Sequence, residues 1–138
     1  MTLSSTDREA IISYRLERAK NTFAELRYVI KGGYWNLAAN RLYYSAFYAC
    51  IALLLKNQIV TTSHAGVNRM MNLHFIQTGI LSEEEGKLLK RLFRMRQTGD
   101  YDDLMDWDEE DVLPYIPKVE NLLSRISELI NERVESGE

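Results

Sequence analysis

The sequence lacks the residues on which several classes of protein depend. It has one cysteine, Cys50, in 138 residues, which excludes an intramolecular disulfide framework and a cysteine-cluster metal site. Two prolines and seven glycines exclude a collagen-like or low-complexity chain and a loop-rich fold. The net charge of −3 argues against a protein that coats nucleic acid by bulk charge. The remaining composition, 46% hydrophobic and 27% charged, is that of an ordinary soluble globular protein.

Apolar runs long enough to cross a membrane are missing too. The most apolar stretch is Leu42 to Leu55, fourteen residues without a formal charge, whereas a bilayer span needs about twenty. Residues 1–8 have no apolar core of signal-peptide length. We therefore expect one domain over residues 1–138, cytoplasmic and not bound to a membrane.

Apolar residues recur at steps of three and four, which is the period of an amphipathic helix. This pattern predicts helices at about 7–31, 36–57, 64–78, 83–98 and 109–133. Pro114 and Pro117 each remove an amide donor, so we expect a kink or a second start in the last helix. The predicted ends rest on two capping boxes (Thr6 with Glu9, Ser82 with Glu85), on Ser63 as an N-cap, and on glycine stops at 32–33, 79 and 99.

The fold class follows from this helical pattern. No segment alternates apolar and polar residues with the two-residue period of a strand. Short loops place consecutive helices side by side in opposite directions. We predict an all-α fold, a single up-and-down antiparallel bundle of about five helices with no sheet.

Most enzyme signatures are absent. The sequence has no GxxxxGK phosphate loop, no GxSxG and no HExxH. Its two histidines, His64 and His74, do not form a zinc-binding pattern with Cys50. We predict neither a metal nor a cofactor.

One candidate site lies on the helix predicted at 36–57. Arg41, Tyr44, Ser45 and Tyr48 follow steps of three and four, which place them on one side of the helix. An arginine beside two phenol rings can bind a phosphate and stack a base. Alternatively, the tyrosines fill the core and send their hydroxyls to its rim.

A second candidate lies at the end of the fourth predicted helix. Arg96 continues the apolar stripe of that helix, and Asp100 and Tyr101 follow across Gly99. A guanidinium, a carboxylate and a phenol around one turn can hold and polarise a phosphodiester. The structural alternative is an arginine that complements the helix dipole and pairs with a nearby acid.

His64 is a third candidate, because it lies at a predicted helix start. The amides of a helix start favour an anion and lower the proton affinity of a nearby imidazole, which keeps the imidazole neutral. His64 can therefore act as a base if the bundle brings it near Arg96. A cap or a tertiary hydrogen bond is the structural alternative.

Charge is unevenly distributed along the second half of the chain. Eight of the twelve residues from Asp100 to Asp111 are acidic, and they follow a basic helix. That helix can track RNA phosphates, or the acidic segment can fold back and neutralise it. Its basic residues are Lys87, Lys90, Arg91, Arg94 and Arg96.

These motifs, in this order, resemble those of the HEPN family of small helical-bundle domains. The resemblance rests on residues 40–48 (NRLYYSAFY), 63–66 (SHAG), 75–79 (FIQTG) and 96–101 (RQTGDY), and it spans nearly the whole chain. It is closest to the branch whose fourth helix ends in Arg-x-x-x-Asp-Tyr, here Arg96 with Asp100 and Tyr101. In the ribonuclease branches that arginine is followed by four to six residues and then a histidine, and no histidine follows Arg96.

The resemblance implies a four- or five-helix bundle, a homodimer, and a nucleotide- or RNA-phosphate-binding module. It also implies a small nucleotidyltransferase as partner in a toxin–antitoxin-type pair. In this hypothesis Arg41 and Arg96 hold phosphate, Tyr44 and Tyr48 stack, and Asp100 orients Arg96. One alternative is a metal-independent ribonuclease that uses Arg96 with Tyr101 or His64. A second is a purely structural partner that neutralises another protein.

Overall fold

The part of the chain that the computed structural model describes, residues 3–101 and 106–132, is helical and contains no strand. Side chains are described for residues 3–96 and 106–132. The helices are α1 (Ser5–Ala24), α2 (Leu26–Lys31), α3 (Trp35–Lys56), α4 (His64–Met71), the π-helical turn η1 (Asn72–Ile76), α5 (Glu83–Tyr101), α6 (Glu109–Val112) and α7 (Tyr115–Asn131). The predicted all-α bundle is confirmed.

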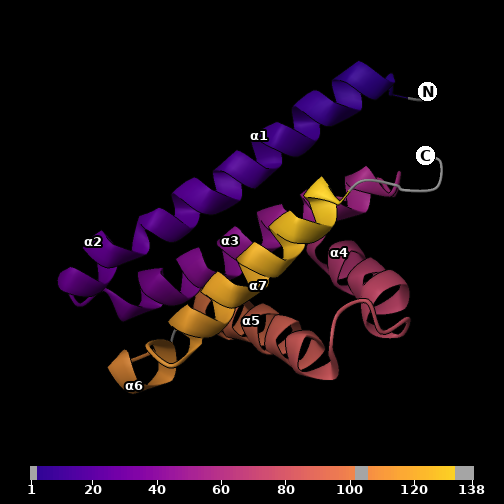
Figure 1. Ribbon diagram of the computed structural model, residues 1–138. Coiled ribbons are helices and arrows are strands. Elements are labelled where there is room, and N and C mark those ends of the chain that lie inside the picture. Colours follow the sequence, from indigo (N-terminus) through magenta and orange to yellow (C-terminus); the bar gives the residue numbers. More distant parts are fainter. Residues whose placement is uncertain (1–2, 102–105, 133–138) are drawn as a thin grey trace.

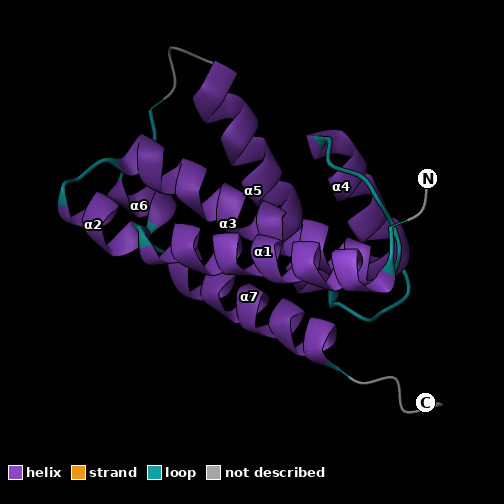
Figure 2. Cartoon of the chain, turned by 90° about the horizontal axis from the view of Figure 1, so that it is seen from above, coloured by secondary structure: helices purple, strands orange, loops and turns teal. Residues whose placement is uncertain are grey.

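Helix α3 is the centre of the bundle. It packs against α1, α5 and α7 and touches α2, α4 and α6. Figure 2 shows α7 on one side of α3, and α4 and α5 on the other. Because α3 is apolar on every side, fourteen of its 22 residues are buried. The apolar run from Leu42 to Leu55 is therefore a core helix.

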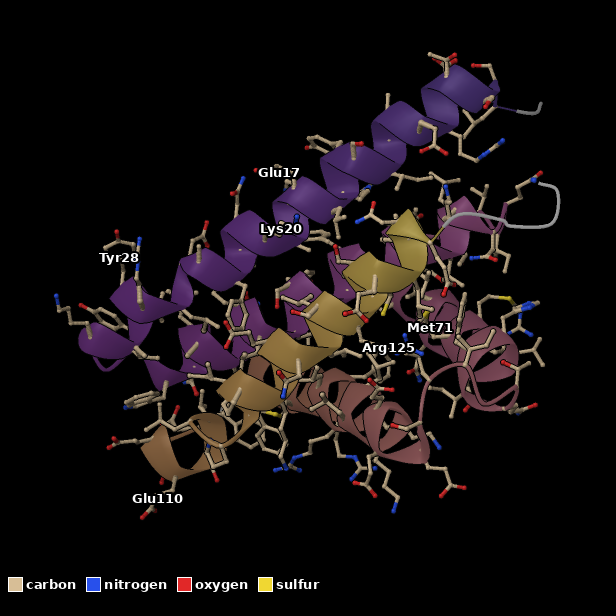
Figure 3. All side chains as sticks on the ribbon, in the orientation of Figure 1. Glu17, Lys20, Tyr28, Met71, Glu110 and Arg125 are labelled. Carbon is tan, nitrogen blue, oxygen red and sulfur yellow. The ribbon has the colours of Figure 1, made fainter. Side chains whose placement is uncertain are left out.

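The surrounding helices each bury one face against α3, as amphipathic helices do. Helix α1 lies antiparallel to α3 and buries Ile12 and Ala19 (Figure 1). Helix α7 buries Val119 and Ile126. Arg125, on the same helix, donates to the carbonyl oxygen of Ile80 at 3.1 Å and so ties α7 to the segment before α5 (Figure 3).

The helix starts follow local hydrogen bonds, most of them predicted. Ser63 caps α4 by accepting from the Gly66 amide at 3.0 Å, and Ser82 and Glu85 form the predicted capping box of α5. The Thr6–Glu9 box was a wrong prediction. Helix α1 starts earlier, and its N-cap is Ser4, which accepts from the Asp7 amide at 3.0 Å.

The predicted stops at glycine were right in two places and wrong in one. Gly33 and Gly79 take positive φ angles of 75° and 81°, which glycine adopts without a steric penalty. Gly99 does not end α5, which continues to Tyr101. A glycine inside a helix costs only about 1 kcal/mol, so it does not by itself end a helix.

Three of the five predicted helices are interrupted. The first breaks at Glu25 between α1 and α2, and the third passes from α4 into the π-helical turn η1. The last restarts after Pro114, as expected, so α6 and α7 are separate. Pro117 lies in the first turn of α7, where an amide has no partner within the helix. None of the described helices is long and apolar enough to span a membrane.

The burial of Cys50 in α3 predicts alkaline destabilisation. Burial raises the pKa of its thiol to about 12, compared with about 8.5 in an unfolded chain. Above that lower value the unfolded chain releases a proton that the folded chain keeps. The free energy of unfolding should therefore fall as pH rises from about 8.5 towards 12, by up to about 1.4 kcal/mol per pH unit. Denaturant unfolding between pH 8 and 10.5 measures this slope.

The Cys50→Ala variant is the control, because it removes this titration and should flatten the decline even if it lowers stability at pH 7. The folded wild type should also resist a thiol-specific reagent at pH 8.5 that labels the unfolded chain readily. Equal labelling rates for the folded and unfolded chains would contradict the burial of Cys50.

Candidate functional site

His64 occupies a defined position at the first residue of α4. Ser63, immediately before it, is the N-cap of the helix. The capping oxygen of Ser63 lies so close to Gly66 that residue 66 cannot carry a side chain. A Cβ atom there would collide with the hydroxyl oxygens of Ser63 and Thr61. The SHAG sequence at 63–66 therefore sets the start of α4 and, with it, the placement of His64.

The imidazole of His64 is held by aromatic residues of α3. Its Nδ1 lies 2.8 Å from the Tyr43 hydroxyl oxygen, and its ring stacks on Phe47 with centroids 4.6 Å apart. The ring of Tyr44 meets it edge-on at 5.8 Å. Burial raises the pKa of the Tyr43 phenol above its usual range. Tyr43 is therefore protonated at neutral pH, and its hydroxyl either donates a hydrogen bond to Nδ1 or accepts one from it, depending on the tautomer of His64.

Arg96 of α5 approaches the same tyrosine. Its positive charge opposes part of the rise in the pKa of Tyr43, an electrostatic effect that requires the guanidinium to be nearby. Arg96 is partly buried. His64 is hydrogen-bonded to Tyr43, and Arg96 lies near enough to act on the same phenol electrostatically, although 31 residues lie between His64 and Arg96 in the sequence. We call Tyr43, His64 and Arg96 the His64 cluster.

Two predicted site residues cannot be placed at the cluster. Asp100 and Tyr101 belong to the last turn of α5, but their side chains lie outside the described residues. Their predicted roles remain predictions.

Behind the His64 cluster there is little space. The cavity between Tyr43, Phe47, His64 and Phe93 has a volume of about 20 Å³, which is room for one water molecule at most. A ligand of this cluster would therefore lie at its rim rather than inside the bundle.

The predicted strip on α3 continues onto α1. The Tyr44 and Tyr48 rings lie 5.8 Å apart. Arg41 lies over Tyr44 at 5.9 Å, and Arg18 of α1 lies over Tyr48 at 4.7 Å. Arg18 also donates to the Tyr48 hydroxyl at 2.9 Å. We call these five side chains the arginine–tyrosine row. It runs Tyr14, Arg18, Tyr48, Tyr44, Arg41, and each arginine in it lies over at least one ring.

Two members of the predicted strip differ from expectation. Ser45 is fully buried and donates to the Leu42 carbonyl oxygen at 2.9 Å, so it does not share the exposed side with its neighbours. Arg41 is partly neutralised, because it forms an ion pair with Glu25 at 3.2 Å and also bonds to Asn40.

Sequence reasoning overlooked Tyr43 and Arg18. A phenol inside an apolar run needs a hydrogen-bond partner, and this requirement could have marked Tyr43. Arg18 follows Tyr14 by four positions, which is the spacing of neighbours on a helix face. Nothing in either pattern says that α1 would place Arg18 against Tyr48.

The described acidic residues after α5 do not neutralise it. Asp108 and Asp111 form the capping box of α6, and Asp106 accepts from Asn36 at 2.9 Å. Lys87, Lys90 and Arg94 are exposed on α5. Within the described ranges, no group of three or more His, Cys, Asp or Glu residues could hold a metal ion.

Substituting Tyr43 should disturb His64 in a measurable way. Tyr43→Phe removes the hydroxyl group and leaves the ring packing intact. Its loss should cost about 1 kcal/mol of unfolding free energy and shift the imidazole ¹⁵N resonances of His64. His74, the other histidine, is exposed and serves as an internal control whose signals should not move. Unchanged His64 resonances would contradict the Tyr43–His64 hydrogen bond.

The chain is similar in sequence to known proteins over most of its length. It matches the HEPN domain over residues 12–129. It is 36% identical over 126 residues to a "UPF0332 protein" of Thermotoga maritima, covering 91% of this chain and 96% of that one.

Two more distant relatives come from Methanocaldococcus jannaschii. The "Putative toxin MJ0142" is 29% identical over 89% of this chain and 84% of its own. The "Putative toxin MJ0605" is 26% identical over 85% of this chain and 87% of its own. The match over residues 12–129 covers far more than half of the sequence. The chain therefore belongs to the HEPN domain family.

Proposed function

We propose that this protein binds the phosphate groups of RNA or a nucleotide along the surface formed by the arginine–tyrosine row and the His64 cluster. The observation that carries the proposal is the placement of Arg18 and Arg41 over the tyrosine rings of that row. Arginines bind phosphates, and tyrosine rings stack on bases whatever the sequence.

The row and the cluster are neighbours, which supports one continuous surface. Tyr44 is a member of the row, and its ring meets His64 edge-on. The small cavity behind His64 cannot enclose a metabolite. An extended single strand lying across the surface is therefore a better ligand for the cluster than an enclosed small molecule.

We propose a toxin-like role in a toxin–antitoxin-type pair, with a small nucleotidyltransferase as partner. The names of the two Methanocaldococcus relatives support this role, as does membership of the HEPN family.

A metal-independent ribonuclease is the second candidate, and it is favoured by the hydrogen bond of His64 to Tyr43 and the electrostatic effect of Arg96 on the same phenol. In this mechanism Arg96 stabilises the charge that develops on the attacked phosphate. His64 takes the place of the absent histidine after Arg96 and removes the proton of the attacking ribose hydroxyl. For this role Nδ1 must carry the ring hydrogen and donate it to the Tyr43 hydroxyl oxygen, so that Nε2 is the basic nitrogen.

RNA binding and cleavage can be tested in one experiment. We expect the wild type to bind a labelled single-stranded RNA. Arg96→Ala and Arg18→Ala should each weaken binding by about tenfold and lower the salt-dependence slope by about 0.7 per lost phosphate contact. Arg94→Ala is the matched control, because it removes an exposed charge from the same helix. Gel shift at several salt concentrations measures both effects.

The same reactions, incubated in EDTA, separate binding from cleavage. Cleavage by the wild type that is lost in both Arg96→Ala and His64→Ala would establish the ribonuclease candidate. RNA and nucleotide binding that is absent, or equally weakened by Arg94→Ala, would refute the phosphate-binding surface. It would leave the structural, protein-neutralising role.

We further propose a homodimer, with a second copy seated on the groove between α1 and α7. Its volume is about 560 Å³, and partly buried Leu16, Phe23 and Leu123 line it. Lys20 lies on one wall and Glu128 on the other, so two copies related by a two-fold axis can exchange ion pairs.

Light scattering at micromolar concentration should therefore give twice the mass of one chain. Lys20→Glu should shift the mass towards the single chain, and Lys31→Glu, an exposed charge reversal outside the groove, should not. A single-chain mass for the wild type would remove the dimer.

A further inference from the structure

A groove lies between α5 and α7, on a different face of α5 from the His64 cluster. Leu88 and Arg91 of α5 line it, whereas Leu89 and Phe93 line the small cavity beside His64. The two faces are separate because residues three or four apart share one side of a helix. The groove has a volume of about 430 Å³, within the range of about 300–1,000 Å³ typical of binding pockets. It is therefore large enough to take side chains of another molecule.

The two helices run in opposite directions along the groove. Arg125 of α7 donates to the carbonyl oxygen of Ile80, just before α5. Tyr115, at the start of α7, lies beside Arg91, further along α5. Figure 1 shows the same antiparallel course. About two turns of each helix line the groove, which is a length of about 10 Å. The groove therefore matches two turns of a third helix laid along it.

One end of the groove is cationic, and aromatic rings hold its cations. The Arg91 guanidinium carbon lies 5.7 Å from the ring centre of Trp107 and 5.8 Å from that of Tyr115. The Lys118 ammonium nitrogen lies 5.3 Å from the centre of the Tyr115 ring. A guanidinium packed on aromatic faces keeps its N–H edge for an anion, and it binds a carboxylate through two parallel hydrogen bonds.

Neither cation is neutralised by the described part of the protein. No described carboxylate lies within 4 Å of Arg91 or Lys118. The Arg91 guanidinium donates no hydrogen bond to a described residue, and its buried Nε has no partner there. Unsatisfied buried donors are rare in folded proteins, so this one points to an acceptor that another molecule supplies.

The other end of the groove is acidic, which limits the kind of anion that fits. Glu84 and Glu85 line this end. Glu85 accepts from the Ser82 amide at 2.8 Å in the capping box of α5, and Glu84 lies 3.8 Å from Lys87. A nucleic-acid strand carries a phosphate on every nucleotide and would place negative charges against these carboxylates. A peptide can carry its acids at one end only, so it fits the groove better.

The floor between the two ends is apolar, and its spacing predicts a pattern in the peptide. Leu88 and Leu122 are buried there. Arg91 follows Leu88 by three residues, and Lys118 precedes Leu122 by four. Floor and cation are therefore about 4.5–6 Å apart along each helix. A docked helix that meets both needs a leucine-like side chain and a carboxylate three or four residues apart.

We propose that the α5–α7 groove is a docking site for an acidic, leucine-bearing helix of a partner protein. The carboxylate of that helix binds Arg91 and Lys118, and its leucine lies over Leu88 and Leu122. This docking site shares no residue with the phosphate-binding surface or with the groove between α1 and α7, so it can be tested separately from both.

Peptide selection tests the docking site directly. Random peptides displayed on phage are selected on the immobilised full-length protein. We expect the enriched sequences to carry Glu or Asp three or four residues from Leu, and to be retained by Lys31→Glu but not by Lys118→Glu. Lys31 is exposed and outside the groove. The absence of this pattern, or equal retention by the two variants, would overturn the docking site.

Fluorescence anisotropy with one enriched peptide then measures each contact. We expect Lys118→Gln and Arg91→Gln each to weaken binding by about tenfold, since each removes a charged contact to a carboxylate. Lys118 is exposed, so its variant should fold even if the Arg91 variant does not. Lys31→Gln is the control, because it makes the same change of charge outside the groove. An equal loss in Lys31→Gln would refute the contacts.

A charge exchange and an RNA competitor complete the experiment. Replacing the acids of the peptide by lysines should abolish binding to the wild type and restore binding to Lys118→Glu. Failure of this exchange would refute the contact between the carboxylate and Lys118. Displacement of the peptide by a single-stranded RNA would assign the groove to nucleic acid and overturn the docking site. Arg96→Ala should keep peptide binding, which separates failure of this site from failure of the phosphate-binding surface.

Discussion

The enclosure of α3 is the constraint on which the rest of the structure depends. A helix that is apolar all round can be stable in water only if other helices cover it on every side. Helices α1, α5 and α7 do so, each with one apolar face. Because α3 is enclosed, a polar group on it lowers the stability of the fold unless that group is hydrogen-bonded. Tyr43 is such a group, and His64 at the start of α4 is its partner.

The packing of the core therefore positions the residues of the candidate site. The hydrogen bond of Tyr43 holds His64 against the rings of α3, and the positive charge of Arg96 on α5 acts on the same phenol. At the edge of α3, where burial is incomplete, Tyr44 and Tyr48 keep one side towards solvent and attract the arginines of the row. A proton-transferring group, a fixed cation and stacking rings are thus assembled by the helices that cover α3.

Features set by residues close in sequence were predictable. The caps at Ser63 and Ser82 need only a partner three residues away, and the restart after Pro114 needs only a missing amide. The N-cap of α1 was predicted at the wrong residue because Ser4 and Thr6 are each followed by an acidic residue three positions later. The two patterns differ too little in free energy for the sequence to distinguish them. The predicted helix end at Gly99 was wrong for a related reason, because glycine permits a helix to end but does not require it.

The sequence by itself determined that the chain is an all-helical bundle with α3 at its centre, because hydrophobic period and helix ends are local properties. It also marked Arg41, Tyr44, Tyr48, His64 and Arg96 as chemically capable. Only the tertiary structure decided which of them meet. It bonded His64 to Tyr43, near enough to Arg96 for that charge to act on the same phenol, and it placed Arg18 on Tyr48. These contacts join residues of different helices, and their geometry depends on packing angles that no single helix encodes.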